Sequence, residues 1–266
     1  MKQQLCTVTS NREIMPGTYL MWLEAPDADT RAQPGQFVAV KCAGFVLRRP
    51  ISIHQSRFVR ASGKGEIALL FRVVGKGTSW LSQRQEHDKI DVLGPLGNGF
   101  TIPGQSERLL LVAGGIGIAP LVFLAQRASP QHEITLVHGA RTAGELYTEH
   151  CRSAFDNGQD VHVIAVTEDG SVGRRGMATL IVSEFLDRAD LVYACGPLDM
   201  YKAMAQMSLR SNLGLATCQV SLEVRMGCGF GACYGCTINT RKGLKRVCRD
   251  GPVFELGDII WQEVKV

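Results

Sequence analysis

The sequence predicts an α+β protein of three domains: an N-terminal antiparallel β-barrel, a doubly wound α/β domain and a small cysteine-rich C-terminal domain. Short β-type runs separated by glycine and proline fill the first hundred residues, a pattern typical of small barrels. From about residue 107 apolar runs alternate with helical stretches, and near the end four of the nine cysteines gather in one segment. We place the domains at residues 1–102, 103–215 and 216–266.

The barrel is predicted from extended apolar runs that turn residues separate. The expected strands are Gly17–Leu23, Phe37–Lys41, Arg49–Ile53 and Glu66–Val74. A short amphipathic helix is expected at Ser79–Gln85. The loop Gly94–Phe100, dense in turn formers, is expected to lead into the next domain.

Two short motifs in this part can contact a phosphate. Arg49 offers a planar fork of N–H donors, and Ser52 on the same extended segment offers a hydroxyl. The run Gly75–Leu81 joins a strand to a helix, and a glycine-rich backbone that enters a helix favours an anion. Taken singly, each motif is also typical of ordinary structure: a solvated arginine on an edge strand, or a plain strand-to-helix turn.

The middle domain is predicted from buried strands that alternate with helices, as in a parallel sheet. The expected strands are Arg108–Ala113, Glu133–Gly139, Val161–Thr167 and Leu191–Cys195. The expected helices are Leu121–Ala128, Ala143–Phe155, Ala178–Leu186 and Asp199–Leu209.

Two strand ends of this domain carry glycines, and ligands of such folds bind at the carboxyl ends of the strands. Gly114, Gly115 and Gly117 follow the first strand, and Pro120 begins its helix. The run Cys195–Pro197 ends the last strand. The spacing differs from the G-x-G-x-x-G fingerprint, so the pair of loops, rather than either loop alone, predicts a nucleotide cleft. The Cys195 thiol either packs in the core or faces a bound nicotinamide.

The C-terminal segment carries the most specific motif of the chain. Cys228, Cys233 and Cys236 are spaced C-x4-C-x2-C, and Cys248 follows. Plant-type [2Fe-2S] clusters use this spacing with a fourth, later cysteine. The alternatives are a zinc site, whose ligands usually come in two short pairs, a disulfide framework, which is unexpected without a secretory signal, and ordinary loop thiols. The other five cysteines are isolated and are expected to pack as small apolar residues.

The bulk composition excludes several classes of function. A net charge of +4 in 266 residues without a long basic run gives no case for nucleic acid binding. No apolar run approaches the roughly 18 residues that a membrane span needs. The N-terminus shows no signal-peptide pattern, so we expect a cytoplasmic protein.

Taken together, these residues resemble the ferredoxin–NADP reductase superfamily, and the cysteine motif makes the chain similar to the electron-transfer subunits of type B dihydroorotate dehydrogenases. The residues that match FAD-binding positions are Arg49, Pro50, Ile51, Ser52, Leu70, Phe71, Arg72, Gly77 and Thr78. The residues that match NAD-binding positions are Gly114, Gly115, Gly117, Pro120, Cys195, Gly196 and Pro197. The residues that match the cluster ligands are Cys228, Cys233, Cys236 and Cys248. Ile51 stands where the superfamily often has a tyrosine.

The resemblance implies that this chain transfers electrons and has no catalytic residue for dihydroorotate itself. An FMN-containing catalytic subunit, in a heterotetramer with two of each subunit, is expected to oxidise dihydroorotate. Electrons would then reach NAD+ through the [2Fe-2S] cluster and FAD, in pyrimidine biosynthesis. The alternatives are the flavin and iron–sulfur subunit of an NAD(P)H:ferredoxin or sulfide oxidoreductase, and a zinc-stapled binding module without enzyme activity. Arg141, Arg174 and Arg175 either read the 2′-phosphate of NADP or are solvated charges.

Overall fold

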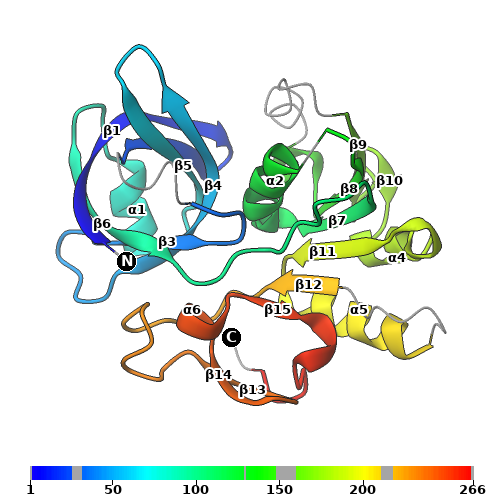
Figure 1. Cartoon of the computed structure of the whole chain (residues 1–266). Helices are drawn as coiled ribbons and strands as arrows, with labels where there is room; N and C mark the ends of the chain where they lie inside the picture. The colour runs from blue at the N-terminus through cyan, green and yellow to red at the C-terminus, as the bar shows by residue number, and fades with distance from the viewer. Residues whose placement is uncertain (1, 26–31, 129, 148–159, 211–217, 265–266) are drawn as a thin grey trace.

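The N-terminal part of the computed structural model is a closed six-stranded barrel (Figure 1). The structure describes residues 2–25, 32–128, 130–147, 160–210 and 218–264. The barrel strands follow the order β1-β2-β5-β4-β3-β6, and every neighbouring pair is antiparallel. Their bounds are β1 Lys2–Met15, β2 Thr18–Glu24, β3 Phe37–Val40, β4 Arg49–Val59, β5 Lys64–Arg72 and β6 Lys89–Leu96. The predicted antiparallel barrel is confirmed.

β1 and β6 are not among the predicted strands. β1 buries Cys6 and Val8 but otherwise consists largely of polar, partly exposed residues, so its composition does not resemble a strand. β6 alternates buried and more exposed residues along its length, but it includes Gly94 and Pro95, which read as a turn. The predicted helix at Ser79–Gln85 forms earlier in the chain, as α1 Lys76–Ser82.

The second part is built on a seven-stranded sheet in the order β10-β9-β8-β7-β11-β12-β15. Its strands are β7 Arg108–Gly114, β8 Glu133–Ala140, β9 Val161–Thr167, β10 Arg174–Arg175, β11 Leu191–Cys195, β12 Cys218–Ser221 and β15 Val253–Glu255. All neighbouring strands are parallel except β12 and β15. The interior residues Leu109–Ala113 of β7 are all buried, as expected for a strand that helices cover on both faces.

Among the described residues, the helices that connect these strands are α2 Ile118–Arg127, α4 Ala178–Val182 and α5 Leu198–Arg210. α2 and α5 agree with the predictions within a few residues. The predicted helix at Ala178–Leu186 is too long, because α4 ends at Val182 and only a 3₁₀ turn follows, at Leu186–Arg188. The predicted helix at Ala143–Phe155 begins as a 3₁₀ turn, Ala143–Glu145, and Leu146 is extended. The rest of that prediction lies outside the described residues.

The C-terminal segment, drawn orange to red in Figure 1, lies beneath the other two parts. It holds the hairpin of β13 Thr237–Thr240 and β14 Gly243–Arg246, the short helix α6 Val247–Asp250 and a 3₁₀ turn at Leu256–Asp258. β12 and β15 come from the same segment but extend the sheet of the middle domain. The sheet therefore contains strands from both sides of the predicted boundary between residues 215 and 216. The bounds of the three domains stay a prediction.

One apolar core joins all three parts. It runs from Leu96 of the barrel through Val112 and Val220 of the sheet to Cys236 and Cys248 of the C-terminal segment. Burial of apolar surface on this scale holds the parts together without directional contacts. No helix in the described ranges is both long and apolar enough to cross a membrane.

Candidate functional site

A cavity of about 820 Å³ lies where the barrel, the carboxyl edge of the sheet and the start of the C-terminal segment meet. Most of the residues that we predicted to bind FAD or NAD line it, although they come from distant parts of the chain. The predicted residues in its wall are Arg49, Pro50, Ile51, Ser52, Leu70, Phe71, Arg72, Thr78, Gly117, Pro120, Cys195, Gly196 and Pro197. Gly77, Gly114 and Gly115 lie outside the lining.

The two motifs with phosphate-binding potential lie against each other. A Cβ added to Gly77 would lie 2.5 Å from Nε of Arg49, so the guanidinium packs directly on this turn. The same guanidinium lies 5.1 Å from the ring centre of Phe45. The Thr78 hydroxyl accepts hydrogen bonds from the backbone N–H groups of Val74, at 3.0 Å, and Gly75, at 3.2 Å. These contacts hold the Arg49 guanidinium and the Gly75–Thr78 turn together beside the cavity.

β5 supplies the neighbouring wall. Leu70 and Phe71 are buried, and Arg72 reaches across to Glu145 of the α/β part, 3.0 Å away. Glu145 also accepts hydrogen bonds from Arg141. The contact with Arg141, followed by that with Arg72, lowers the pKa of the Glu145 carboxyl to about 2. Arg141, one of the three arginines considered for a 2′-phosphate, therefore forms an ion pair with a carboxylate of this same chain.

Arg174 is likewise engaged. It forms two hydrogen bonds of 2.7 Å with the Glu184 carboxylate. Because both side chains are about half exposed, this ion pair adds little to stability.

The glycines after β7 have a packing role that the sequence analysis did not foresee. A Cβ on Gly117 would collide with the carbonyl group of Cys195, and a Cβ on Gly114 would lie 2.5 Å from Cδ of Pro197. Both positions therefore need glycine so that the ends of β7 and β11 can meet. Gly115 has a φ of 52°, and its missing Cβ would point into open space.

Two buried side chains that the sequence analysis did not single out fix these loops. Nε2 of His138, at the end of β8, donates to the Gly115 carbonyl over 3.1 Å. Burial lowers the pKa of His138 to about 4, so its imidazole is neutral near neutral pH. A histidine within an apolar strand is more often a core residue than a functional one, so only its partner in the folded chain reveals this role.

Tyr201 is the second missed residue. Its hydroxyl accepts a hydrogen bond from the backbone N–H of Gly196, at 2.8 Å, and donates one to the carbonyl of Ser221, at 2.7 Å. Its ring stacks on Trp261 with centroids 5.3 Å apart. Tyr201 therefore joins the Cys195–Pro197 turn to β12 of the C-terminal segment.

The segment that leads into the cysteine motif also lines the cavity, from Ser221 to Met226. Glu223 keeps an exposed face there, while the surrounding protein desolvates its carboxyl and raises its pKa. Burial, reinforced by the Glu223 charge, raises the pKa of the Cys195 thiol to about 12. Cys195 is therefore a protonated thiol at neutral pH and not a thiolate nucleophile.

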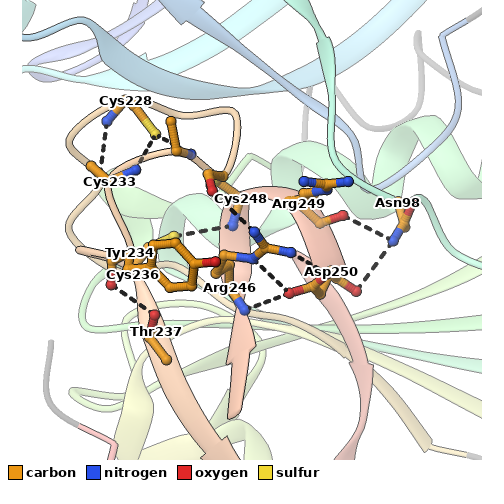
Figure 2. Close-up of polar contacts among 12 residues, drawn as sticks. Asn98, Cys228, Cys233, Tyr234, Cys236, Thr237, Arg246, Cys248, Arg249 and Asp250 are labelled. Carbon is orange, nitrogen blue, oxygen red and sulfur yellow. Dashed lines mark hydrogen bonds and ion pairs between the residues drawn. The ribbon is translucent and has the colours of Figure 1, made fainter.

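The cysteine loop directs backbone N–H groups at sulfur (Figure 2). Sγ of Cys228 accepts from Ala232, at 3.2 Å, and from Cys233, at 3.4 Å. Sγ of Cys233 accepts from Cys228, at 3.4 Å, and from Gly235, at 3.5 Å. Such N–H donors stabilise negative sulfur, which is what an iron–sulfur cluster requires of its ligands. The donor set and the surrounding amides fit a cluster.

The four thiols stand as two pairs. Cys228 and Cys233 lie together near the surface, whereas Cys236 and Cys248 are buried, and the Cys248 N–H lies 3.4 Å from Sγ of Cys236. Across the residues described, no group of three or more cysteine, histidine or acidic side chains is arranged as a metal site. Burial opposes the ionisation of Cys228, but hydrogen bonds from the backbone of Phe230 and Cys233 outweigh it and lower its pKa to about 6.

Asn98, two residues after the last barrel strand, anchors the end of α6. Its side-chain amide donates to the carbonyls of Arg249, at 3.3 Å, and Asp250, at 3.2 Å, and its backbone N–H donates to Gly251. Arg246 completes the frame, because it is paired with Asp250 and donates to the carbonyl of Gly231, at 3.1 Å. α6 is thus tied to Asn98 on one side and, through Arg246, to the cysteine loop on the other (Figure 2).

This fold and site define an iron–sulfur oxidoreductase with a nicotinamide nucleotide-binding domain. Residues 111–206 match the family model of the oxidoreductase NAD-binding domain. Residues 223–260, which include all four cysteines of the motif, match the iron–sulfur cluster binding domain of dihydroorotate dehydrogenase B.

Similar proteins extend the match to nearly the whole chain. The electron transfer subunit of dihydroorotate dehydrogenase B (NAD(+)) from Desulforamulus reducens is 40% identical over 94% of this chain and 95% of its own length. The same subunit of Caldanaerobacter subterraneus subsp. tengcongensis is 38% identical over 96% of this chain and 97% of its own length. This chain therefore belongs to the family of electron transfer subunits of NAD(+)-dependent dihydroorotate dehydrogenase B.

Solved structures agree with this fold. The NADH-dependent reduced ferredoxin-NADP oxidoreductase, described for flavin-based electron bifurcation, superposes with a TM-score of 0.83 at 30% identity, over 97% of this chain and 91% of that one. A ferredoxin NADP+ reductase from Neisseria gonorrhoeae with bound FAD and NADP has a TM-score of 0.62 at 18% identity, over 80% of this chain and 92% of that one. The second likeness concerns the fold alone.

Proposed function

We propose that this chain passes electrons between an FMN-containing subunit that oxidises dihydroorotate and NAD+, with FAD bound in the cavity and a [2Fe-2S] cluster bound by the four cysteines. One observation carries the proposal: a single cavity is lined by the Arg49–Ser52 strand, the loop Gly114–Pro120 (the nucleotide loop), the Cys195–Pro197 turn and the segment that enters the cysteine motif. Family membership supports dihydroorotate as the substrate of the complex and a separate catalytic subunit as the partner.

Arg49 and its neighbours suit the flavin. The guanidinium lies on the Gly77 turn, where it can neutralise the pyrophosphate of FAD. Ser52, Leu70 and Phe71 line the same cavity and would flank the ring system. Ile51 gives an aliphatic contact where a tyrosine would stack.

The nucleotide loop and the Cys195–Pro197 turn suit NAD. They lie at the carboxyl ends of β7 and β11, where ligands of open α/β sheets bind. His138 and Tyr201 hold the two loops in place through the carbonyl of Gly115 and the N–H of Gly196. We propose NAD rather than NADP as the acceptor, because the similar subunits are named for NAD(+) and because Arg141 and Arg174 are each paired with a glutamate. Arg175 is exposed and does not contribute to this choice.

Cys228, Cys233, Cys236 and Cys248 would hold the cluster. When bound, the cluster carries single electrons, the flavin exchanges one or two, and the nicotinamide takes a hydride, which places the flavin between the other two. The residues of this chain contribute the N–H donors around the sulfurs and the short link of residues 221–227 to the cavity.

The partner would dock on the exposed side of the cysteine loop. Cys233 is exposed there, and the apolar side chains of Phe230, Tyr234 and Leu244 are 44%, 65% and 69% exposed. Large exposed apolar side chains beside a redox site are typical of a protein interface. The heterotetramer with two of each subunit and the cytoplasmic location stay predictions.

The likeness to the NADH-dependent ferredoxin-NADP oxidoreductase favours a second candidate, an electron-transfer subunit that serves ferredoxin. Its identity of 30% is lower than the 35–40% of the dihydroorotate dehydrogenase subunits. Co-purification separates the two: the first candidate expects an FMN protein that reduces NAD+ with dihydroorotate, and the second expects no such activity.

Substitution Cys233→Ser tests the proposed relay. In the complex with the catalytic subunit, we expect loss of cluster iron and of dihydroorotate-dependent NAD+ reduction. NADH-dependent reduction of ferricyanide should persist, because the cavity and its loops are intact. The measurements are iron content, the visible spectrum and the two activities.

Cys42→Ala is the matched control, because Cys42 is a buried cysteine of the barrel outside the motif. It should keep iron and both activities. Full dihydroorotate-dependent activity in the Cys233→Ser complex would refute the proposed function, and so would wild-type protein that binds neither iron nor flavin.

A further inference from the structure

His54 joins the barrel to the α/β part beside the cavity. It lies on β4, two residues after Ser52, and its side chain is fully buried. Nδ1 lies 2.9 Å from the carbonyl oxygen of Ala119, in the first turn of α2. Nε2 lies 2.9 Å from the hydroxyl of Tyr147, whose ring meets the imidazole edge-on at 5.2 Å.

The partners fix the tautomer of His54. A carbonyl oxygen only accepts hydrogen bonds, so Nδ1 carries the proton and donates it to Ala119. Nε2 then accepts from the Tyr147 hydroxyl. Burial lowers the pKa of His54 to about 4, so the neutral imidazole that this arrangement requires is present near neutral pH.

His54 lies where the two walls of the cavity meet. Pro50 and Ser52, on the same strand as His54, line one wall. Gly117 and Pro120, next to the His54 partner Ala119, line the other. Phe123 of α2 packs into the barrel core. That contact is apolar and therefore non-directional. The hydrogen bond from His54 is directional and ties the backbone of α2 to β4 at one carbonyl.

We propose that His54 is a positioning residue for hydride transfer. It holds the nucleotide loop at a fixed distance from the Arg49–Ser52 strand, where the flavin is proposed to bind. This inference rests on the proposed function, because the distance matters only when flavin and nicotinamide meet in the cavity. Hydride transfer depends steeply on the approach of the reacting atoms, and a displacement of about 1 Å can cost roughly 100-fold in rate. His54 itself does not line the cavity and is not a catalytic residue.

The test compares three substitutions in the FAD-loaded protein. Leucine at position 54 removes both hydrogen bonds, asparagine places an amide N–H near the position of Nδ1, and glutamine places one near Nε2. The readout is stopped-flow reduction of the flavin by NADH over a range of concentrations, which separates the limiting rate constant from the dissociation constant of NADH.

We expect His54→Leu to lower the limiting rate constant by roughly tenfold or more, His54→Asn to restore it to within about threefold of wild type, and His54→Gln to resemble His54→Leu. The long-wavelength charge-transfer absorbance between NADH and flavin should weaken in the two slow variants. If His54→Leu does not fold, the contrast between asparagine and glutamine still decides the matter.

His132→Leu is the matched control. His132 is also buried and also bonded to a backbone group, the N–H of Glu107, but it lies at the opposite, amino edge of the sheet. It should keep the wild-type rate constant even if it lowers stability. Equal rate constants for His54→Asn and His54→Gln, a wild-type rate in His54→Leu, or an equally slow His132→Leu would overturn the inference. Wild-type protein whose flavin NADH does not reduce would instead contradict the proposed function.

Discussion

At the scale of single residues, hydrogen bonds from side chains to backbone groups define the site more than charge does. His138 bonds a backbone group of the nucleotide loop, and Tyr201 bonds one of the Cys195–Pro197 turn. Neither side chain is charged near neutral pH. Desolvation raises the pKa of Tyr201 well above that of a free tyrosine, so its O–H stays available as a donor. A buried backbone group that loses such a partner costs about 1–3 kcal/mol.

Tyr201→Phe is therefore expected to destabilise the protein by about 1–3 kcal/mol, because the Gly196 N–H and the Ser221 carbonyl lose their partner while the stacking on Trp261 remains. Urea denaturation measures the change in the free energy of unfolding. Tyr19→Phe is the control, since the Tyr19 hydroxyl forms an exposed contact with Glu13, and it should change stability by less than about 0.5 kcal/mol. Equal stabilities for the two variants would contradict the role given to Tyr201.

At the scale of elements, the site depends on how closely strand ends approach. β7 and β11 are parallel neighbours, and the turns that follow them touch at Gly114 and Gly117. The glycine pattern was read from the sequence as room for a pyrophosphate. The structure adds that two of the three glycines make room for the protein's own chain: Gly117 for the backbone of Cys195, and Gly114 for the side chain of Pro197.

Gly117→Ala should destabilise the protein by about 1–3 kcal/mol, because its Cβ would collide with the backbone of Cys195 and neither strand end can move without loss of sheet pairing. The dissociation constant for NADH should rise at the same time. Thermal unfolding and NADH titration check both effects. Gly104→Ala is the control, since nothing lies within 4 Å of its added Cβ. A Gly117→Ala protein as stable as Gly104→Ala would show that the two loops can separate freely.

At the scale of the whole molecule, two buried histidines make stability depend on pH, and one of them joins the barrel to the α/β part. His54 bridges the barrel and the α/β part, and His138 lies under the nucleotide loop. Burial lowers the pKa of both from an ordinary 6.5 to about 4. In this range the unfolded chain binds protons that the folded chain does not.

The free energy of unfolding should therefore fall as the pH drops from about 6.5 to about 4, by up to about 1.4 kcal/mol per pH unit for each histidine. Above pH 6.5 the two histidines add no pH dependence. Chemical denaturation at several pH values measures the slope, and His54→Asn should reduce the part of the slope that the two histidines contribute by about half. An unchanged slope in this variant would contradict the assignment of His54 as a buried, neutral group.

Local pattern was sufficient to predict the elements that leave a continuous run or a fixed spacing in the sequence. The apolar runs of β5 and β7 and the C-x4-C-x2-C spacing are visible in the sequence, because strands with both faces buried consist of apolar residues and cluster ligation fixes the intervals between its ligands. β1 was missed because its composition is polar, and the helix predicted at Ala143–Phe155 begins as a 3₁₀ turn.

The sequence by itself determined the kinds of chemistry: four thiols at ligand spacing, an arginine beside a serine, and two glycine loops at strand ends. Only the tertiary structure decided which residues meet. It placed Arg49 on Gly77, Tyr201 between Gly196 and Ser221, and His54 between Ala119 and Tyr147. The physical reason is that ligand spacing is a local property of the backbone, whereas these contacts depend on how a barrel, a sheet and a loop pack around a shared core.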